Sequence, residues 1–440
     1  MEVSRRWWRN GWLFLGGLRR RVRSQRWHRV LALSALTGAV TGFAIVGFEA
    51  LTSRVLLDWV FEWPRAAQVA APAIGLVLAW AALHWLGRDA SPSTSDEYLR
   101  AYHDPKHPFD TRAFPGRVLA SIATLGFGGP LGFEGPSIYI GAGIGSWIER
   151  RFARFLTRDD LRLMLVAGAA AGVSAIFKAP ATGAVFAIEV PFQEDTAAHA
   201  LLPALVGSAT AYLTYVAVYG TSRLFAISGE PALDAIRILG ALGLGALAGL
   251  GARAFALALR GAKSHSGRLR SSYRLVFGGL GLAAVTTVSL VLFDDGLTLG
   301  PGYRAISWTL DPHRGVMLIA ALFLLHAVAT VLAVEGGGAG GLFIPLFVQG
   351  WLLGRFVQGI TGTHTSLFPV VGAAAFLGAG YRTPVAGIVF VAEVTGRPGF
   401  VVPALLATVV AQVLMGTSSV TTYQPVRRPE APGASDERSW

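Results

Sequence analysis

Long apolar segments with almost no charge recur from end to end of this 440-residue chain. They are residues 30–48, 66–87, 117–147, 163–190, 200–219, 237–261, 275–293, 316–334, 341–361, 366–392 and 399–416. A helix needs about 20 apolar residues to cross a bilayer, so many of these segments are long enough to span one. Because lipid offers the backbone no hydrogen bonds, such a chain must satisfy them internally. We therefore predict an all-α, polytopic membrane protein.

The composition agrees with this prediction. The chain is 53% hydrophobic and only 15% charged, whereas an average soluble domain has about 25% charged residues. The segments 117–147, 163–190 and 366–392 are too long for one span or are interrupted by glycine and proline. We expect each of these segments to contain paired or partial helices.

Arginine dominates residues 1–29, which precede the first apolar segment. Basic residues beside a first span favour the cytoplasmic side. Together with Trp7, Trp8, Trp12 and Trp27 they are typical of an amphipathic helix on the cytoplasmic leaflet. A nucleic-acid-binding arm is the less favoured alternative, and the segment lacks the pattern of a signal peptide. We expect a multi-pass protein of the cell (plasma or inner) membrane with a cytoplasmic N-terminus and no nucleic-acid partner.

An internal repeat divides the chain. Residues 177–190 (FKAPATGAVFAIEV) match residues 381–394 (YRTPVAGIVFVAEV), and GAAA at 168–171 recurs at 372–375 with the same offset. The shared positions pair Pro180, Gly183, Phe186, Glu189 and Val190 with Pro384, Gly387, Phe390, Glu393 and Val394. The symmetry of Glu189 and Glu393 suggests scaffold roles, such as hydrogen bonding to helix ends or loops.

A second match lies upstream of each copy. Residues 134–145 (EGPSIYIGAGIG) and 343–354 (FIPLFVQGWLLG) share a proline and two glycines, namely Pro136/Pro345, Gly141/Gly350 and Gly145/Gly354. A proline in the first turn is compatible with a helix start. We therefore place one membrane half at 30–220 and the other at 221–417, with a polar tail at 418–440.

The charges of two loops indicate how the halves are oriented. Residues 149–162, after the first matched helix, are rich in arginine, whereas residues 356–368, after the second, contain no arginine or lysine. Positive charge favours the cytoplasm, so the equivalent loops face opposite sides of the membrane. The sequence predicts an inverted repeat of two halves with broken and partial helices, an arrangement common in transporters.

Glycine-rich breaks precede both matched helices, at 125–136 (LGFGGPLGFEGP) and 335–345 (EGGGAGGLFIP). Irregular backbone at membrane depth persists only where protein or a water-filled cavity satisfies it. A helix start presents unpaired N–H groups and partial positive charge, and glycine lets an ion approach them. Two converging starts would therefore form an anion site that repels cations. The alternative is that the glycines only permit close helix packing, which we favour for Gly141 and Gly145.

Glu134 is the only residue in the run 129–147 that is charged at neutral pH. A carboxylate in a membrane segment is costly and needs a function or a partner. It is attracted to the same N–H groups that would hold an anion, so it can occupy the anion's place and leave when protonated or displaced. We interpret Glu134 as a gate, with a simple cap of its own helix as the alternative.

At these residues the sequence resembles the CLC family of chloride channels and proton–chloride exchangers, and in particular its prokaryotic type. The family motif G-(K/R)-E-G-P is similar to residues 132–136 (GFEGP), and G-x-F-x-P is similar to residues 341–345 (GLFIP). The resemblance covers roughly residues 30–420. It implies a CLC-like fold, a homodimer with one anion pore per subunit, and Glu134 as the gating glutamate. It also implies anion binding by the backbone amides of Phe133, Glu134, Gly135, Leu342, Phe343 and Ile344.

The resemblance further implies a pore serine and a pore tyrosine. The serine falls in residues 92–98 (PSTSDEY), at Ser93 by the family's usual interval, with Thr94 and Ser95 as alternatives. An ordinary helix cap explains this segment equally well. The tyrosine falls in residues 418–425 (SSVTTYQP), at Tyr423, or else Thr421 stands at that position.

Two departures from the family pattern affect the expected mechanism. Phe133 replaces the basic residue before the gating glutamate, which removes a positive charge from the outer mouth. Exchangers of the family carry an inward glutamate where this chain has Val190. Because valine cannot carry a proton, we expect a chloride-conducting, channel-like protein without proton coupling. Glu194 and Asp195 lie close enough to keep a proton–chloride antiporter with a relocated inner acid as the alternative.

Other functions are less favoured. A fluoride exporter of the same family would depart from the E-G-P ending retained at 134–136. An intramembrane enzyme could use Glu134, Glu189, Glu335, Glu393, His84 or His326, but no nucleophile–base pair is recognisable. The chain ends about two dozen residues after its last span, so we expect no appended nucleotide-binding CBS domains.

We expect neither a metal site nor a cofactor. The chain has no cysteine, which excludes thiolate ligands. His103 and His107 have helical metal-ligand spacing, but Pro105 and Pro108 make that segment a loop. The expected partners are chloride or a similar small anion, the lipid bilayer and a second copy of the chain.

Overall fold

A computed structural model describes residues 25–104, 108–157, 160–222, 224–225, 234–363 and 366–426. The arginine-rich residues 1–24, for which an amphipathic helix was expected, lie outside the described residues. So do His107 and most of the polar tail, from residue 427 onward.

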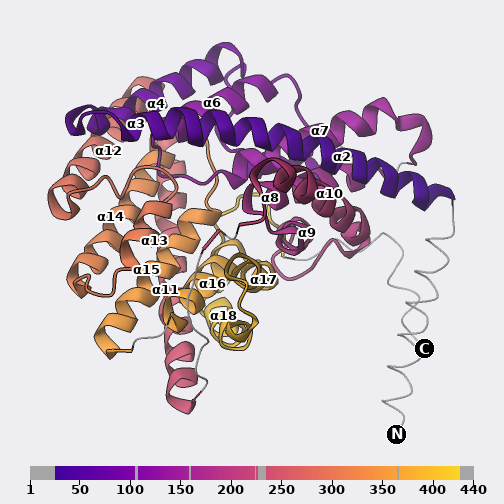
Figure 1. The fold of residues 1–440 in the computed structure, drawn as a ribbon. Coiled ribbons are helices and arrows are strands. Elements are labelled where there is room, and N and C mark those ends of the chain that lie inside the picture. Colours follow the sequence, from indigo (N-terminus) through magenta and orange to yellow (C-terminus); the bar gives the residue numbers. More distant parts are fainter. Residues whose placement is uncertain are drawn as a thin grey trace, which may run out of the picture.

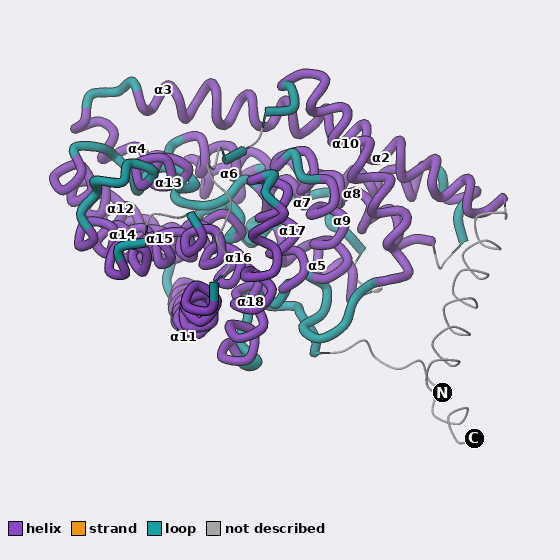
Figure 2. The backbone as a smooth tube through the Cα atoms, turned by 60° about the horizontal axis from the view of Figure 1, so that its bottom comes forward, coloured by secondary structure: helices purple, strands orange, loops and turns teal. Residues whose placement is uncertain are grey.

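The described chain is helical, with one isolated β-bridge (Figures 1 and 2). The helices of the first half are α2 (Gln25–Glu49), the π-helix η1 (Ala50–Leu57), α3 (Asp58–Phe61), α4 (Arg65–Trp85), α5 (Ser95–His103), α6 (Phe114–Gly126), α7 (Glu134–Arg151), η2 (Ala153–Phe155), α8 (Leu161–Phe177), α9 (Pro180–Glu189), η4 (Ala198–Ala200) and α10 (Leu201–Tyr219). Those of the second half are α11 (Ala235–Ser266), α12 (Ser271–Phe293), α13 (Tyr303–Thr309), α14 (Val316–Glu335), α15 (Phe343–Thr361), α16 (Leu367–Tyr381), α17 (Pro384–Thr395), η5 (Pro398–Phe400) and α18 (Val401–Met415).

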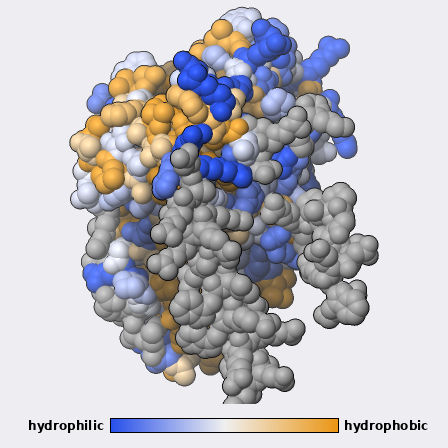
Figure 3. All heavy atoms as spheres, turned by 90° about the vertical axis from the view of Figure 1, so that its right-hand side faces the viewer, coloured by the Kyte–Doolittle hydropathy of each residue, from blue (hydrophilic) through white to orange (hydrophobic). Residues whose placement is uncertain are grey.

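Within the described residues, 8 helices are long and apolar enough to cross a membrane. Large apolar side chains on the outer surface are solvent-accessible in the isolated chain, among them Phe43, Trp85, Leu213, Ile236 and Val291. Figure 3 shows such hydrophobic residues gathered in a patch, with hydrophilic residues gathered toward the top edge. This distribution fits a body surrounded by lipid, and the chain is an integral, multi-pass membrane protein.

The expected breaks within the long apolar segments are confirmed. Segment 117–147 contains α6 and α7, separated by residues 127–133. Segment 163–190 contains α8 and α9, and segment 366–392 contains α16 and α17. Each of the short helices α9 and α17 begins at its proline, where the missing N–H costs no intrahelical bond.

The two halves repeat the same packing, which confirms the predicted repeat. In the first half α8 contacts α7, α9 and α10, and in the second half α16 contacts α15, α17 and α18. The halves meet where α9 contacts α17. In Figure 1 the first half lies above, with α2 running across it, and most of the second half lies below.

Glycine pairs hold the matched helices together. A Cβ atom at Gly141 would lie 2.0 Å from the carbonyl oxygen of Gly168, and one at Gly350 would lie 2.2 Å from that of Gly372. One at Gly145 would lie equally close, 2.0 Å, to the carbonyl oxygen of Met164. The packing interpretation of Gly141 and Gly145 is therefore confirmed, and the second half uses the same device.

Gly350→Ala is expected to destabilise the protein, because its Cβ atom would collide with the backbone of α16. Overpacking of this kind costs about 1–3 kcal/mol. Gly243→Ala is the matched control, since Gly243 lies in α11 and a methyl group there would have nothing within 4 Å. Thermal unfolding of the detergent-solubilised variants measures the difference. Equal melting temperatures for the two variants would contradict the packing role of Gly350.

Candidate anion site

The two glycine-rich breaks are hydrogen-bonded to each other. The N–H of Gly132 donates to the carbonyl oxygen of Gly341 at 2.8 Å, and the N–H of Gly341 donates back at 2.7 Å. This bridge is antiparallel and lies just before the starts of α7 and α15. The two helices therefore begin side by side and run in opposite directions. The expected convergence of the helix starts is confirmed.

Glycine is required for so close an approach. A Cβ atom at Gly135 would lie 2.8 Å from the Cα atom of Gly341, and one at Gly341 would lie 1.9 Å from the Oε1 atom of Glu134. Any side chain at these positions would push the breaks apart or displace the glutamate. The glycines thus allow backbone N–H groups from both halves to face one small volume.

Glu134 fills this volume. Its side chain is completely buried, and its Oε1 atom accepts a hydrogen bond from the N–H of Phe343 at 2.5 Å. The amides of Ile344 and of Glu134 itself also face the carboxylate. The carboxylate of the first half therefore lies at the start of α15 in the second half. Its Oε2 atom is buried with no hydrogen-bond partner among the described residues.

The other amides predicted to bind an anion lie around the same point. The N–H of Leu342 faces the hydroxyl of Tyr381 at 3.3 Å, while that of Phe343 is occupied by Glu134. Phe133 directs its ring to Phe48 of α2, with the ring centroids 6.3 Å apart. Gly135 packs against Gly341.

A cavity of about 490 Å³ reaches Gly341 and Leu342 from one side. Its lining includes the candidate hydroxyl residues of both segments singled out in the sequence, namely Ser93, Thr94, Ser95, Thr421 and Tyr423. The helix α6 begins beside this cavity at Phe114 and runs toward the break, and α7 returns from the break to Arg151. The cavity and the arginine-rich loop after α7 therefore lie on the same side of Glu134.

The hydroxyl candidates differ in how they lie. Thr94 is buried, its Oγ1 atom has no partner among the described residues, and it lies 2.7 Å from the place of a Cβ atom on Gly135. Ser93 and Ser95 are only partly buried. Tyr423 lines the cavity but is 48% exposed. Thr421 bonds to Ser419 and Gln424.

Tyr381 is a site residue that the sequence reasoning missed. It is buried, lines the cavity and places its hydroxyl at the N–H of Leu342. The repeat contained a signal for it, because Tyr381 stands where the first copy has Phe177. A hydroxyl added at one of two equivalent aromatic positions marks a place where the halves differ chemically.

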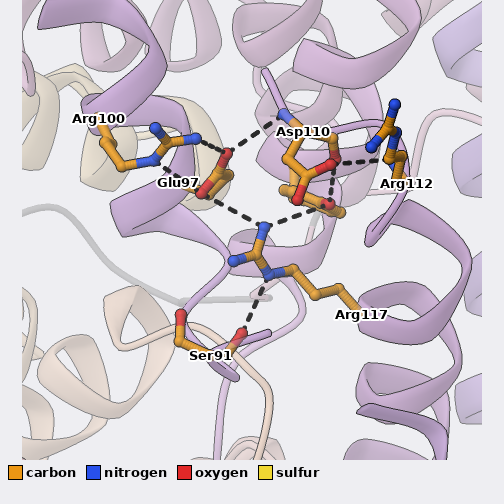
Figure 4. Close-up of polar contacts among 7 residues, drawn as sticks. Ser91, Glu97, Arg100, Asp110, Arg112 and Arg117 are labelled. Atoms are coloured by element: carbon orange, nitrogen blue, oxygen red, sulfur yellow. Dashed lines mark hydrogen bonds and ion pairs between the residues drawn. The ribbon is translucent and has the colours of Figure 1, made fainter. Parts of the chain in front are cut away.

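The wall of the cavity is basic. Arg100, Arg117, Lys263 and Arg274 line it, against Asp96 and Glu97. Figure 4 shows Glu97 between Arg100 and Arg117, whose guanidinium nitrogens lie 2.5 and 3.3 Å from the carboxylate. Arg117 also donates to the carbonyl oxygen of Ser91 at 3.0 Å (Figure 4). The excess of positive charge in an enclosed space attracts anions.

The repeated glutamates have the scaffold role expected of them. Glu189, at the end of α9, accepts hydrogen bonds from the N–H groups of Val385 and Ala386 at 3.1 and 2.8 Å. Glu393 in α17 accepts from the N–H groups of Ala181 and Thr182 at 2.8 and 2.7 Å, and from the Thr182 hydroxyl. Each glutamate therefore caps the helix that carries the other one. A carboxylate at a helix N-terminus is favourable, and here the repeat uses it reciprocally.

Val190 and the neighbouring acids lie apart from the cavity. Val190 is the buried residue that ends α9, and its carbonyl oxygen accepts from the side-chain amide of Gln424. Glu194 and Asp195 lie in the loop after α9, where Glu194 faces Arg382 at 3.7 Å. None of the three lines the cavity that reaches Gly341.

The histidines considered from the sequence are engaged in local contacts. His84 lies 2.7 Å from Asp89, His103 lies 2.7 Å from the carbonyl oxygen of Pro191, and His326 is fully buried beside Gln349. Glu335 is hydrogen-bonded to His265. Within the described ranges no cluster of histidine and acidic side chains has the make-up of a metal site.

Comparison with known proteins gives one consistent result. The model of the voltage gated chloride channel family matches residues 74–416. A ClcB-like chloride channel protein of Ralstonia nicotianae is 28% identical over 410 residues, which is 87% of this chain and 93% of the relative. The voltage-gated ClC-type chloride channel ClcB of Escherichia coli is 27% identical over 425 residues, 88% of this chain and 96% of the relative.

Solved structures share the fold. The structure of a slow cyanobacterial Cl⁻/H⁺ antiporter matches with a TM-score of 0.77 at 21% identity, over 88% of this chain and 94% of the other. That of a CLC-type fluoride/proton antiporter matches with a TM-score of 0.77 at 25% identity, over 91% and 99%.

Glu393→Ala is expected to destabilise the protein, because it leaves two backbone N–H groups at the start of α9 without a partner. Leaving such groups unsatisfied costs about 1–3 kcal/mol. Glu393→Gln retains an acceptor oxygen and should lose less. Thermal unfolding in detergent measures both, with Glu62→Ala as the control because Glu62 is exposed. If Glu393→Ala melts like Glu62→Ala, the reciprocal capping contributes no stability.

Proposed function

The chain belongs to the voltage-gated chloride channel (CLC) family, and from that premise we propose that it transports chloride or a similar small anion through a pore gated by Glu134. One observation carries the proposal. The Glu134 carboxylate occupies the amides of α15 at the point where the helix starts of both halves meet. A group of N–H donors that accepts a carboxylate in a buried site can accept a halide in its place.

Gating follows from competition for these donors. While Glu134 is ionised it binds the Phe343 amide and closes the path. This hydrogen bond weakens when a chloride ion enters from the cavity or when a proton reaches the carboxylate. The side chain can then move away from the amide. The Oε2 atom has no partner in the part of the chain that the structure describes, so it is easier to displace than the oxygens of Glu189 or Glu393, which are all hydrogen-bonded.

The anion ligands that we propose are those implied by the two motifs, namely the backbone amides of Phe133, Glu134, Gly135, Leu342, Phe343 and Ile344. Of the hydroxyl candidates, the burial of Thr94 against Gly135 favours it over Ser93. Tyr381 is favoured over Tyr423, because its hydroxyl reaches the Leu342 amide. Thr94 and Tyr381 thus stand on the cavity side of Glu134.

We favour channel-like transport over antiport. Proton coupling needs a titratable group between Glu134 and the inner solution, and Val190 cannot supply one. The alternative is a proton–chloride antiporter that uses Glu194. It draws support from the two antiporters whose solved structures share the fold. The loop position of Glu194 beside Arg382 argues against it.

We further propose the membrane orientation and assembly. An ion pair of 2.7 Å between Arg26 and Asp160 holds the start of α2 beside the arginine-rich loop after α7. Both segments are basic, so we place them and the cavity on the cytoplasmic side. The halves at 30–220 and 221–417 then cross the membrane in opposite senses, and the pore is repeated in a homodimer.

Purified protein in liposomes is expected to release chloride in preference to potassium or sodium, without moving protons uphill. The reason is a site of amide donors with no inner acid to receive a proton. Chloride efflux recorded together with external pH tests both parts. Cation efflux of equal size would contradict the anion pore. Stoichiometric proton uptake driven by chloride, abolished in Glu194→Gln, would establish the antiporter instead.

Glu134→Gln is expected to give faster or less pH-dependent chloride flux in a protein that folds normally. A neutral amide side chain competes poorly with an anion for N–H donors. Efflux across a pH series measures the change, and Glu62→Gln on the surface serves as the control. Flux and pH dependence like those of the unmodified protein would reduce Glu134 to a structural cap.

A further inference from the structure

The side of Glu134 opposite the cavity lacks the basic residue that the family motif has at position 133. Phe133 turns instead toward Phe48, the next-to-last residue of α2. The end of α2 therefore lies beside the gate. Charged residues on α2 and on its continuation η1 are consequently placed where they can act on an anion near Glu134.

Glu49 and Arg54 are these charged residues. Their side chains approach to 3.9 Å, and the Arg54 guanidinium lies over the ring of Tyr219, 3.8 Å from its centroid. Arg54 belongs to the π-helix η1, and π-helical segments are frequent at functional sites. The Oε2 atom of Glu49 is buried with no hydrogen-bond partner in the described structure.

Lys178 completes the group from another element. It follows Phe177, whose ring lies 5.1 Å from that of Phe343, the residue whose amide holds Glu134. Its ammonium donates to the carbonyl and hydroxyl oxygens of Ser222 at 3.1 and 3.0 Å. Its charge also acts on the Glu49 carboxylate.

The backbone at Lys178 is unusual for a lysine. This residue ends α8 in the left-handed conformation, with φ of 52°, where glycine is the common choice. Its counterpart in the repeat, Arg382, ends α16 in the same conformation, with φ of 60°. Arg382 lies 3.7 Å from the carboxylate of Glu194, and Lys178 lies within electrostatic reach of that of Glu49. The inverted repeat thus ends both α8 and α16 on a cation that lies near a carboxylate.

The lengths of the helices show on which side the first pair lies. The helix α2 begins beside Asp160 and has 25 residues, so at 1.5 Å per residue it extends roughly 35 Å toward Glu49. The helix α8 begins directly after Asp160, at Leu161, and ends at Phe177. Tyr303 lies within electrostatic reach of both Glu134 and Glu49. Glu49, Arg54 and Lys178, here called the outer cluster, therefore lie on the far side of Glu134 from the cavity.

We propose that the outer cluster is an anion-recruiting site, which takes the role of the basic residue absent at position 133. This proposal rests on the proposed function. Lys178 and Arg54 attract chloride toward the gate. Glu49 competes with the arriving ion for the two cations, as Glu134 competes for the amides deeper in the path. The cluster has two positive charges and one negative charge. Removing the charge of Lys178 leaves it neutral and cancels its attraction for chloride, whereas removing the charge of Glu49 strengthens that attraction.

Planar bilayers with chloride varied separately on the two faces test this proposal. Lys178→Gln should raise the half-saturating chloride concentration roughly tenfold on one face, with little change on the other face or in the maximal current. Glu49→Gln should lower it on that same face. Phe133→Lys combined with Lys178→Gln should restore a value near that of the unmodified protein. Arg65→Gln is the matched control, because Arg65 is an exposed cation after α3 that bonds to Asp294.

A charge-keeping variant separates recruitment from packing. Lys178→Arg should behave like the unmodified protein, and if it behaves like Lys178→Gln the role of Lys178 is structural and the proposal is overturned. Unchanged chloride dependence on both faces in Lys178→Gln, with chloride current still present, overturns it while leaving the proposed function intact. Absence of any chloride current from the unmodified protein overturns the proposed function itself, and the recruitment proposal with it.

Discussion

The antiparallel pair of hydrogen bonds between Gly132 and Gly341 is the contact on which the rest of the site depends. A broken helix in a membrane must find partners for its backbone groups within the protein. Here each break supplies them to the other, which is possible only because glycines permit the approach. Once the breaks are paired, the starts of α7 and α15 necessarily face each other. Their remaining N–H groups then converge on the volume that Glu134 fills.

Among the described residues, Glu134, Glu189 and Glu393 are buried or half-buried glutamates that interact with helix starts, and they do so in different ways. Glu189 and Glu393 each bind consecutive amides of the partner helix with both oxygens. Glu134 faces three amides and binds that of Phe343 most closely, but its second oxygen has no partner among the described residues. The same attraction between a carboxylate and a helix start therefore gives a stable helix cap at Glu189 and at Glu393. In the third case the proposed function makes it a contact that an ion can replace, because the second oxygen has no hydrogen bond to lose.

Features carried by short sequence patterns could be predicted, whereas those created by distant segments could not. Proline after glycine marked the starts of α7 and α15, and the repeated PxxGxxFxxEV pattern marked α9 and α17. Tyr381 and Thr94 gained their importance only when the bridge brought the break at Gly341 beside them. The short helix α13 and the π-helix η1 were also missed, because their stability comes from packing against neighbours rather than from their own pattern.

The repeat duplicates the backbone of the site but not its chemistry, which fits the single gate of the proposed function. The position that matches Glu134 in the second half is Phe343. The bridge sets these two positions beside each other, so that the amide of Phe343 holds the carboxylate of Glu134. A second glutamate at position 343 would place two carboxylates in one enclosed volume, where they could not both be ionised. The site combines amide donors from both halves with a carboxylate from only one half. Its hydrogen-bond donors therefore outnumber its acceptors. The excess of donors is what a diffusible anion can use.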